Sequence, residues 1–531
     1  MNAPALPTGT IDAADADVNV PAPAPDAAKH TIARLLIFTA LYFTGACCWA
    51  SRKTMWFDEI FTWKLAELHS MRELWAALKA GIELNPPLSF VLTHYSHVLF
   101  GASHVSNRLP AIAGFWLMTI CLFAFVRRRT DTTHAWLALL APCFTFATFY
   151  STDARPYGMI LGATALALLC WQSAAERIAR PWSLAGLAGS IAVLISLHYF
   201  TVYVVLAIGL GEIVRSAVHR RADVAVFAAM LVGLIPLVFW WPLISIASKC
   251  TQHFWSPPSL SELHETYVQI ASPIWFLVLC IALIAFAIRK PAAGLPRRRK
   301  LPLHEAVTCS LLAVMPMVMF VAALFLTNAF YPRYVLPVVP GVVICAVAWL
   351  YQTGAAQPRL VKIAVAVLTA GFVLQELNNA LMVFIMPPPA VQVMSGFRFP
   401  KDRLPVAIGN DDAFLKLRFY APREIADRCV YLADMKAAAN KLGVDTGERS
   451  LLQWNAQHPD NVVGYGEFLR THREFYAVRV LPSAWLIQQL SADGAQMQLV
   501  SSSKRPQFDA EEQMWFRVQP PASLTAAPGS R

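Results

Sequence analysis

The chain is built around repeated apolar stretches, each close to the length that crosses a membrane. Eleven stretches reach or approach the roughly 20 residues that a helix needs to span the ~30 Å hydrocarbon core of a bilayer. They cover residues 31–50, 106–126, 134–150, 154–173, 182–198, 200–215, 224–245, 270–288, 306–327, 334–352 and 360–385. Hydrophobic residues make up 56% of the 531 residues and charged residues only 15%, against about 45–50% and 25% in soluble domains. The sequence therefore predicts a polytopic α-helical membrane protein, and it excludes a disordered chain, a fibrous repeat and an ordinary cytosolic enzyme.

Both ends of the chain differ from this apolar middle, which predicts three regions. Residues 1–29 are rich in Ala and Pro and lack the basic start of a cleaved signal peptide, so we expect a disordered cytoplasmic tail. Residues 30–386 form the predicted transmembrane domain, with a first external loop at 51–86. Residues 390–520 are polar, and β-like runs at 404–408, 429–432, 475–480, 497–500 and 514–518 alternate with helical stretches. We expect a small α/β domain there, large enough at about 130 residues to bury its own core.

The distribution of Lys and Arg predicts the orientation, because cytoplasmic loops are enriched in basic residues. The segment 87–100 is short for a span; if it is interfacial or re-entrant, the inner side carries 18 basic residues and the outer side 9. A full span there would place Arg127, Arg128 and Arg129 outside. We therefore expect about 11 spans, or about 13 with an extra hairpin of short helices. The protein is predicted in the inner (plasma) membrane, with a cytoplasmic N-terminus and an extracytoplasmic C-terminal domain. The net charge of +11 is then a topology signal, and no nucleic-acid partner is expected.

Cysteine usage indicates little chemistry. Eight of the ten cysteines lie in apolar runs and no CxxC pair occurs, which is typical of small buried hydrophobes. Cys250 and Cys429 are both predicted outside, so a disulfide between them is left open.

Five polar clusters interrupt the apolar pattern near membrane level. They are Asp58-Glu59, Glu83-Leu84-Asn85, Asp153-Ala154-Arg155-Pro156-Tyr157, His198-Tyr199 and Tyr331-Pro332-Arg333-Tyr334. Each has an ordinary explanation: a helix start in the aromatic belt, a proline-terminated turn, an ion pair across a turn, a packing histidine and a snorkelling arginine. All five fall on the predicted outer face, however, whereas independent anchors would be spread over both. Carboxylates with Arg, His and Tyr at one depth indicate a site for a phosphate-bearing, membrane-embedded substrate, where Arg grips phosphate and a carboxylate takes a proton from an acceptor hydroxyl.

The order of these motifs resembles a known family. Asp58-Glu59, Asn85-Pro86-Pro87-Leu88, Leu99-Phe100-Gly101 followed by Arg108, Asp153-Ala154-Arg155-x-Tyr157 and Pro332-Arg333-Tyr334 occur in that sequence over residues 30–385. Together they resemble the family 39 membrane glycosyltransferases of GT-C type, such as the protein O-mannosyltransferases and the lipid A aminoarabinose transferases. The resemblance implies an inverting glycosyltransferase that uses a polyprenyl-phosphate-linked sugar at the extracytoplasmic face.

The resemblance also implies roles for individual residues. Asp58 matches the catalytic carboxylate, the expected general base, and Glu59 is its usual companion. The expected substrate-binding residues are Glu83, Asn85, Arg108, Asp153, Arg155, Tyr157, His198, Tyr331, Arg333 and Tyr334. Some relatives carry His or a Glu-Lys pair where this chain has Leu84-Asn85, so no obligatory metal or other cofactor is predicted, although a divalent metal is left open. The expected partners are the polyprenyl-phosphate sugar donor and a lipid, glycan or protein acceptor.

Two other functions are weighed against the transferase. A ligase or polymerase of lipid-linked glycans would place essential Arg and His residues in a large late external loop, but residues 246–268 contain no Arg and two His. A transporter or flippase would place its site near the middle of the membrane, whereas these charges gather at one face. In the C-terminal domain, Gly409-Asn410-Asp411-Asp412 is favoured as a capped helix start over an acceptor contact. The sugar, the acceptor and the polyprenol length are left open.

Overall fold

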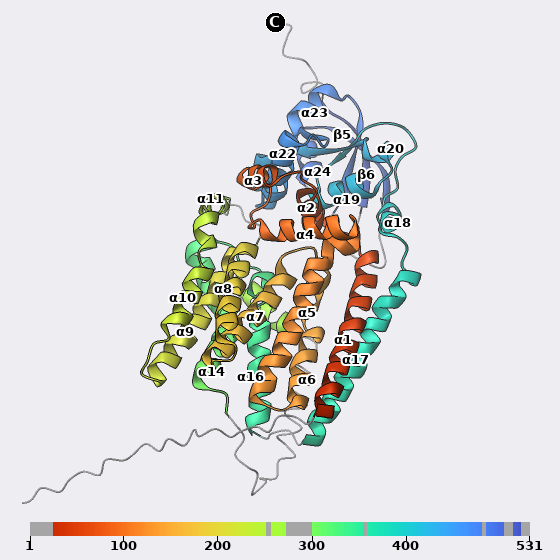
Figure 1. The fold of residues 1–531 in the computed structure, drawn as a ribbon. Helices are drawn as coiled ribbons and strands as arrows, with labels where there is room; N and C mark the ends of the chain where they lie inside the picture. Colours follow the sequence, from red (N-terminus) through yellow and green to blue (C-terminus); the bar gives the residue numbers. More distant parts are fainter. Residues whose placement is uncertain are drawn as a thin grey trace, which may run out of the picture.

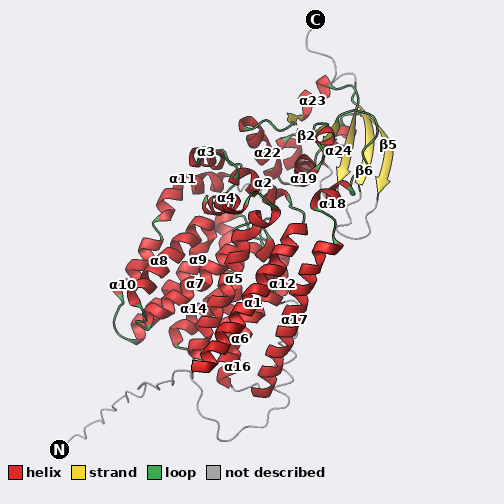
Figure 2. Ribbon diagram, turned by 45° about the vertical axis from the view of Figure 1, so that its right-hand side comes forward, coloured by secondary structure: helices red, strands yellow, loops and turns green. Residues whose placement is uncertain are grey.

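The computed structural model describes residues 25–250, 256–271, 300–353, 358–480, 485–503 and 513–521. Figure 1 shows a bundle of long helices with a smaller domain at one end. In Figure 2 the strands are confined to that smaller domain, and the bundle is helical throughout. The predicted fold class, a polytopic helical protein with a C-terminal α/β domain, is confirmed.

Six helices of the described residues are long and apolar enough to cross a membrane. They are α1 (Pro25–Arg52), α5 (His104–Arg129), α7 (Tyr157–Ala175), α8 (Arg180–Leu197), α9 (Val202–Val218) with the preceding turn η3 (Tyr199–Thr201), and α17 (Pro358–Ile385). Helix α1 begins five residues before the predicted boundary at residue 30, and the rest of the predicted tail lies outside the described residues. Apolar runs predict these helices well because each fills a whole span.

Three further predicted spans are bent helix pairs, which raise the number of candidate spans to nine in the described part of the chain. The helix α6 (Thr132–Leu140) with η1 (Ala141–Phe144) meets η2 (Phe146–Thr152) at 73°. The helices α10 (Val224–Gly233) and α11 (Pro236–Lys249) meet at 40°, and α14 (Leu303–Ala313) meets α15 (Met315–Ala322) and η4 (Ala323–Thr327) at 53°. Pro236 and Pro316 stand at the second and third of these breaks, where a missing N–H ends the helical ladder, and Pro142 stands at the change from α6 to η1, just before the first break.

The last two predicted spans have different outcomes. Helix α16 (Val338–Thr353) is apolar but shorter than the six long helices. The predicted span at 270–288 lies outside the described residues, apart from its first two residues at the end of α12 (Leu260–Ala271).

The segment 87–100 forms a helix at the end of the bundle. Helix α4 (Leu88–Phe100) lies across that end beside α2 (Phe57–Ala66) and α3 (Met71–Lys79), as Figure 1 shows, and it is not among the candidate spans. Whether this helix is interfacial or re-entrant stays a prediction. The predicted first external loop is therefore largely helical, and it forms a layer between the bundle and the C-terminal domain.

The C-terminal domain holds a six-stranded sheet in the order β3-β2-β1-β4-β6-β5. The first four strands in this order are parallel neighbours, and β6 and β5 are added antiparallel. Five strands match predicted runs: β1 (Val406–Ile408), β2 (Cys429–Ala433), β4 (Phe475–Val480), β5 (Gln496–Ser503) and β6 (Gln513–Gln519). Strand β3 (Val462–Gly464) was not predicted, because its two valines stand between Asn461 and Gly464 without a longer apolar run, whereas the equally short β1 lies within the run 404–408.

The helices of this domain connect and cover the strands. They are α18 (Pro389–Met394), α19 (Asp411–Tyr420), α20 (Arg423–Ala426), α21 (Met435–Leu442), α22 (Thr446–Gln457), α23 (Tyr465–Thr471) and α24 (Trp485–Ala492).

The two faces of the sheet belong to two different hydrophobic cores. Side chains alternate along a strand, so Ala407 packs with Trp485 in a core within the domain, whereas Val406 and Ile408 face the other way. That second core also contains Ile60 and Phe61 of α2. The domain therefore buries only one face by itself, and it shares the other core with the layer that carries Asp58.

Candidate active site

A cavity of about 240 Å³ lies where the end of the bundle meets the C-terminal domain. Its wall comes from the start of α2, the 81–85 loop, the start of α7, the break between α8 and α9, the 326–334 segment and α22. Eight of the predicted site residues line it: Asp58, Glu83, Asn85, Arg155, Tyr157, His198, Arg333 and Tyr334. Residues from five separate sequence motifs are thus brought to one place.

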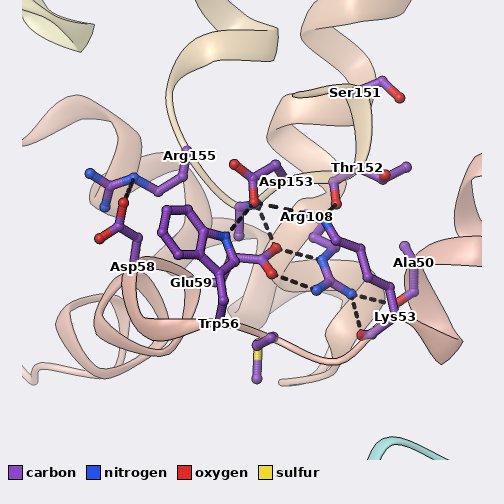
Figure 3. A network of polar contacts seen from close by, with 12 residues as sticks. Ala50, Lys53, Trp56, Asp58, Glu59, Arg108, Ser151, Thr152, Asp153 and Arg155 are labelled. Carbon is purple, nitrogen blue, oxygen red and sulfur yellow. Dashed lines mark hydrogen bonds and ion pairs between the residues drawn. The ribbon is translucent and has the colours of Figure 1, made fainter. Parts of the chain in front are cut away.

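Asp58 stands in the first turn of α2 between two arginines. Its Oδ2 lies 3.5 Å from Nε of Arg155 and 3.4 Å from Nη1 of Arg333; Figure 3 shows the first of these contacts. The two guanidinium groups are almost fully buried, with 4% and 10% of each side chain exposed. Burial raises the pKa of Asp58, and Arg155 and Arg333 oppose this without reversing it. The result is a carboxylate that is more basic than an exposed one.

Arg155 is held in place by Glu83. Nη1 of Arg155 donates to Oε2 of Glu83 at 2.6 Å, and the other oxygen of Glu83 accepts from Leu84 N–H at 2.9 Å and from Asn85 Nδ2 at 3.1 Å. Burial alone would raise the pKa of Glu83, but the charge and hydrogen bond of Arg155 lower it below its usual value. Glu83 is therefore ionised, and it fixes the guanidinium rather than competing with Asp58 for protons.

Aromatic rings surround the guanidinium of Arg333. Its central carbon lies 5.3–5.7 Å from the ring centres of Trp56, Tyr157, Tyr331 and Tyr334. Ring faces attract a cation without neutralising it, so Arg333 keeps its charge for an anion. Tyr331 takes part through this contact, although it is not among the residues that line the cavity.

His198 interrupts the helical hairpin of α8 and α9 in an extended conformation, with φ −163°. Burial, together with the charges of Arg155 and Arg333, lowers the pKa of His198 to about 3. The ring is therefore neutral. Its Nδ1 accepts a hydrogen bond from Phe200 N–H at 3.2 Å, which leaves the proton on Nε2 as a donor.

Glu59 and Arg108, both expected at the substrate, form a fully buried ion pair and are not among the residues that line the cavity. Nε and Nη2 of Arg108 donate to the two Glu59 oxygens at 2.6 and 2.7 Å, and both side chains are 0% exposed. Arg108 also donates to the carbonyl oxygens of Ala50, Lys53 and Thr54, at the end of α1. Glu59 accepts from Ala154 N–H at 2.8 Å. The pair therefore ties the end of α1, the start of α5 and the 153–155 turn together (Figure 3).

Asp153 is likewise buried behind the cavity wall rather than within the cavity. It accepts a hydrogen bond from Trp56 Nε1 at 2.9 Å, and Lys53 Nζ lies 3.7 Å away. Burial raises the pKa of Asp153, and the charge of Lys53 opposes this. Figure 3 shows Asp153 between the indole and the Glu59–Arg108 pair.

The sequence does not predict that the C-terminal domain contributes to the cavity. Thr446, Arg449 and Ser450 of α22 line the cavity, as do Ala247 and Ser248 at the end of α11. The side chains of α22 stand in a polar domain, where a polar residue is ordinary, so no sequence pattern distinguishes them from their neighbours. Cys250 and Cys429 are both free in the structure, which answers the open question of a disulfide. Among the described residues no group of three or more His, Cys, Asp or Glu could hold a metal ion.

The chain resembles known proteins both in sequence and in structure. Residues 85–246 match the profile of the dolichyl-phosphate-mannose-protein mannosyltransferase family. No curated protein sequence matches the chain. The crystal structure of ArnT from Cupriavidus metallidurans in the apo state has a TM-score of 0.56 at 15% identity, covering 94% of this chain and 100% of that one. The structure of the same protein bound to undecaprenyl phosphate has a TM-score of 0.53 at 16% identity, with the same coverage. The resemblance inferred from the motifs is confirmed: the chain has the fold of the GT-C membrane glycosyltransferases, and its residues 85–246 carry the pattern of their mannosyltransferase family.

Proposed function

We propose that the protein is an inverting glycosyltransferase that moves a sugar from a polyprenyl-phosphate donor to an acceptor hydroxyl at the extracytoplasmic membrane face. The observation that carries the proposal is the position of Asp58 in the cavity between the buried guanidinium groups of Arg155 and Arg333. A carboxylate beside two cations suits a reaction in which a proton is accepted while a phosphate departs. The similar structure of ArnT with bound undecaprenyl phosphate supports a lipid-phosphate donor.

In the proposed reaction, Asp58 accepts the proton of the acceptor hydroxyl as the acceptor oxygen attacks the anomeric carbon of the donor sugar. The new C–O bond forms as the bond from the anomeric carbon to the phosphate oxygen breaks, so the configuration inverts. Polyprenyl phosphate leaves with the electron pair, and it needs little acid assistance because phosphate is a weak base. Arg155 and Arg333 stabilise the charge that develops on its oxygens.

The same two arginines regulate how strongly Asp58 holds a proton. Before donor binding they contact its Oδ2 at 3.5 and 3.4 Å. When the donor phosphate takes up part of their charge, the carboxylate becomes a stronger base at the moment when a base is needed. Glu83 keeps Arg155 in position, and neutral His198 offers an Nε2–H to the phosphate or the sugar.

We assign Glu59, Arg108 and Asp153 positioning roles. The Glu59–Arg108 pair fixes the chain that leads from α1 into α2, and Asp153 orients Trp56, whose ring lies against Arg333. None of the three touches the cavity. Each acts through a neighbour that does.

The expected orientation is supported by the charges at the far end of the bundle. Helix α5 begins beside the site and runs for 26 residues to Arg127, Arg128 and Arg129, a distance of about 39 Å at 1.5 Å per residue. A basic triplet at that end favours the cytoplasmic side. The C-terminal domain, at the opposite end, would then be extracytoplasmic.

Replacement of Asp58 by Asn tests the proposal. In proteoliposomes loaded with a polyprenyl-phosphate sugar, we expect Asp58→Asn to lower acceptor-dependent release of polyprenyl phosphate by about 10²- to 10⁴-fold, the usual contribution of a general base. The matched control is Asp427→Asn, at an exposed carboxylate of the C-terminal domain, which should release it at the wild-type rate. Near-normal transfer by Asp58→Asn would remove Asp58 as the base. Movement of intact donor across the membrane without release would favour a transporter.

A further inference from the structure

A second cavity, of about 380 Å³, lies between α1, the η1–η2 segment and α17. It shares no lining residue with the first cavity. Helix α17 has only 22% of its most apolar window buried, so the second cavity lies beside a helix that faces lipid. Figure 1 shows α1 and α17 side by side at the edge of the bundle.

Helix α17 presents a polar face to this cavity. Gln375, Glu376 and Asn379 line it, whereas Leu374 and Leu377 on the same helix are 67% and 50% exposed. A carboxylate and two amides on one helical face are costly at membrane depth unless they have a partner or a function. We therefore interpret this polar face as a binding site.

The burial of the Glu376 carboxyl group is the largest unfavourable free-energy contribution in this arrangement. It is 5% exposed, its Oε2 accepts from Asn379 Nδ2 at 3.1 Å, and it forms no ion pair with any residue that the structure describes. The facing residue on α1 is Gly45, and a side chain there would collide with the Glu376 carboxylate. The two helices thus leave room for this group at the edge of the cavity.

Aromatic rings form much of the remaining wall. Tyr42, Trp49, Phe115, Phe144 and Phe149 line the cavity, together with Thr145, Thr148 and Ser151, whose hydroxyl groups donate to backbone carbonyls and can still accept a hydrogen bond. Flat apolar faces beside carboxylate, amide and hydroxyl groups suit a ligand with both C–H faces and hydroxyl edges, which describes a sugar ring. A volume of about 380 Å³ admits one or two such rings.

Lys53 connects the two cavities. It lines the second cavity, and its Nζ donates to the Thr152 carbonyl at 3.0 Å and lies 4.5 Å from the ring centre of Phe149. The same Nζ is 3.7 Å from Asp153, which holds Trp56 against Arg333. The two cavities are therefore back to back across one wall of charged and aromatic side chains.

We propose that the second cavity binds the saccharide headgroup of a membrane glycolipid. Its hydroxyls would bond to Glu376, Gln375 and Asn379, its ring face would stack on the aromatic wall, and its lipid tail would lie in the bilayer beside α17. As an addition that rests on the proposed function, this glycolipid is the acceptor, anchored by one sugar here while another part reaches Asp58. The acceptor class is then a lipid-linked saccharide.

Binding of alkyl glycosides tests the site independently of catalysis. The protein is placed in phosphatidylcholine nanodiscs and titrated with dodecyl maltoside, and bound adducts are counted by native mass spectrometry. Dodecyl octaethylene glycol ether has the same tail without a sugar, and dodecylphosphocholine carries a zwitterionic headgroup. We expect saturable binding of the maltoside alone, and at least a 10-fold weaker Kd in Glu376→Gln. The matched control is Asn378→Ala, which changes a neighbouring residue on the exposed side of α17.

Several outcomes would overturn the proposal. Equal binding of all three detergents would show only apolar adsorption, preference for dodecylphosphocholine would assign the cavity to a phospholipid, and equal loss in Glu376→Gln and Asn378→Ala would remove the carboxylate as a ligand. Gln375→Ala is a second variant, expected to weaken binding, should Glu376→Gln not fold. Asp58→Asn should bind the maltoside normally, so the site can stand even if the proposed reaction fails. The acceptor assignment alone fails if dodecyl maltoside does not inhibit transfer by the wild type.

Discussion

The carboxylate of Asp412 accepts a hydrogen bond from the backbone N–H of Phe57, with 2.7 Å between Oδ1 and the nitrogen, although 355 residues separate them. Phe57 is the first residue of α2, and the preceding Trp56 provides no side-chain cap. Tyr420 accepts a second hydrogen bond from Met55 N–H, at 2.9 Å. The C-terminal domain therefore supplies the helix cap for the residue next to Asp58, and it is a structural part of the candidate site.

Loss of this cap should impair turnover more than donor binding. Asp412→Ala removes the acceptor, which costs about 1 kcal/mol for a helix N-cap, and it frees the first turn of α2 that carries Asp58. We expect kcat to fall while the KM for the donor changes little, because Arg155 and Arg333 are untouched. Asp412→Asn keeps an oxygen acceptor at the same place and should restore most of the rate. An equal loss of rate in both variants would show that charge, and not the cap, is what matters.

Replacement of Arg333 by Gln should move the acid limb of the pH–rate profile. The base acts only when Asp58 is ionised, so the rate rises with pH through its pKa. Arg333 lowers that pKa against the effect of burial; without it the pKa rises and the limb moves to higher pH. The donor KM should also increase by about 10- to 100-fold, as expected for loss of a charged hydrogen bond.

Arg449→Gln is the matched control for this measurement. Arg449 lines the same cavity but pairs with Asp445 and is not among the groups that shift the pKa of Asp58. Its variant should leave the acid limb in place. A limb that moves to lower pH in Arg333→Gln would contradict the assignment of Asp58 as the base.

The Glu59–Arg108 pair should contribute to stability far more than a surface ion pair. Arg108→Met leaves the Glu59 carboxylate buried without its ion-pair partner, which costs about 3–5 kcal/mol. We expect a large fall in thermal stability in detergent, and partial recovery when Glu59→Leu is added. Glu474→Gln, which breaks the exposed pair with Arg517, should have no measurable effect. If thermal stability does not recover in the double variant, the hydrogen bonds from Arg108 to the carbonyl oxygens at the end of α1, and not its charge, hold this part of the chain.

The sequence predicts the bundle because each apolar run fills one span, but it does not predict how the runs bend. Pro236 was visible in the sequence, yet a proline in a membrane helix is compatible with a straight, kinked or broken span. Five strands are predicted from β-branched and aromatic runs, whereas β3 consists of two valines between Asn461 and Gly464 and forms no such run. The shared core was not predictable, because the residues of α2 and β1 show which faces are apolar but not what covers them.

The candidate site was predicted to the extent that charge is costly near a membrane. Asp58, Arg155 and Arg333 stood out for that reason and lie together. Glu59 and Arg108 stood out equally, because a buried structural pair and a ligand-binding pair have the same sequence signature. The sequence does not distinguish Arg449, because an arginine in a polar, hydrated domain has no desolvation cost. Only the three-dimensional arrangement separates these cases.

Removal of divalent metal should leave the activity unchanged. No metal requirement is predicted from Leu84-Asn85, and the proposed charge stabilisation comes from Arg155 and Arg333. We expect equal rates before and after dialysis against EDTA, with Mg²⁺, Mn²⁺ or Zn²⁺ giving no increase. A rate that falls on chelation and returns with one metal would add that ion to the donor-phosphate site. Asp58→Asn assayed with the same metals separates such an effect from base catalysis.

Helix α22, which forms one wall of the cavity, should lose stability as the pH rises. Burial, with the nearby carboxylate of Asp412, raises the pKa of Asp411 to about 6, and burial raises that of Glu448 to about 7, against about 4 in an unfolded chain. Both groups therefore bind protons more tightly when folded, so their stabilisation is complete below about pH 4 and is lost as the pH passes through 6 and 7. Hydrogen exchange of α22, which carries Glu448, Arg449 and Ser450, should accordingly quicken between pH 5 and 8 after correction for intrinsic rates. The Glu448→Gln side chain cannot ionise, so this variant should flatten the pH dependence, whereas Asp427→Asn should not. Slower exchange at pH 8 than at pH 5 would show that the two carboxyl groups do not control the stability of α22.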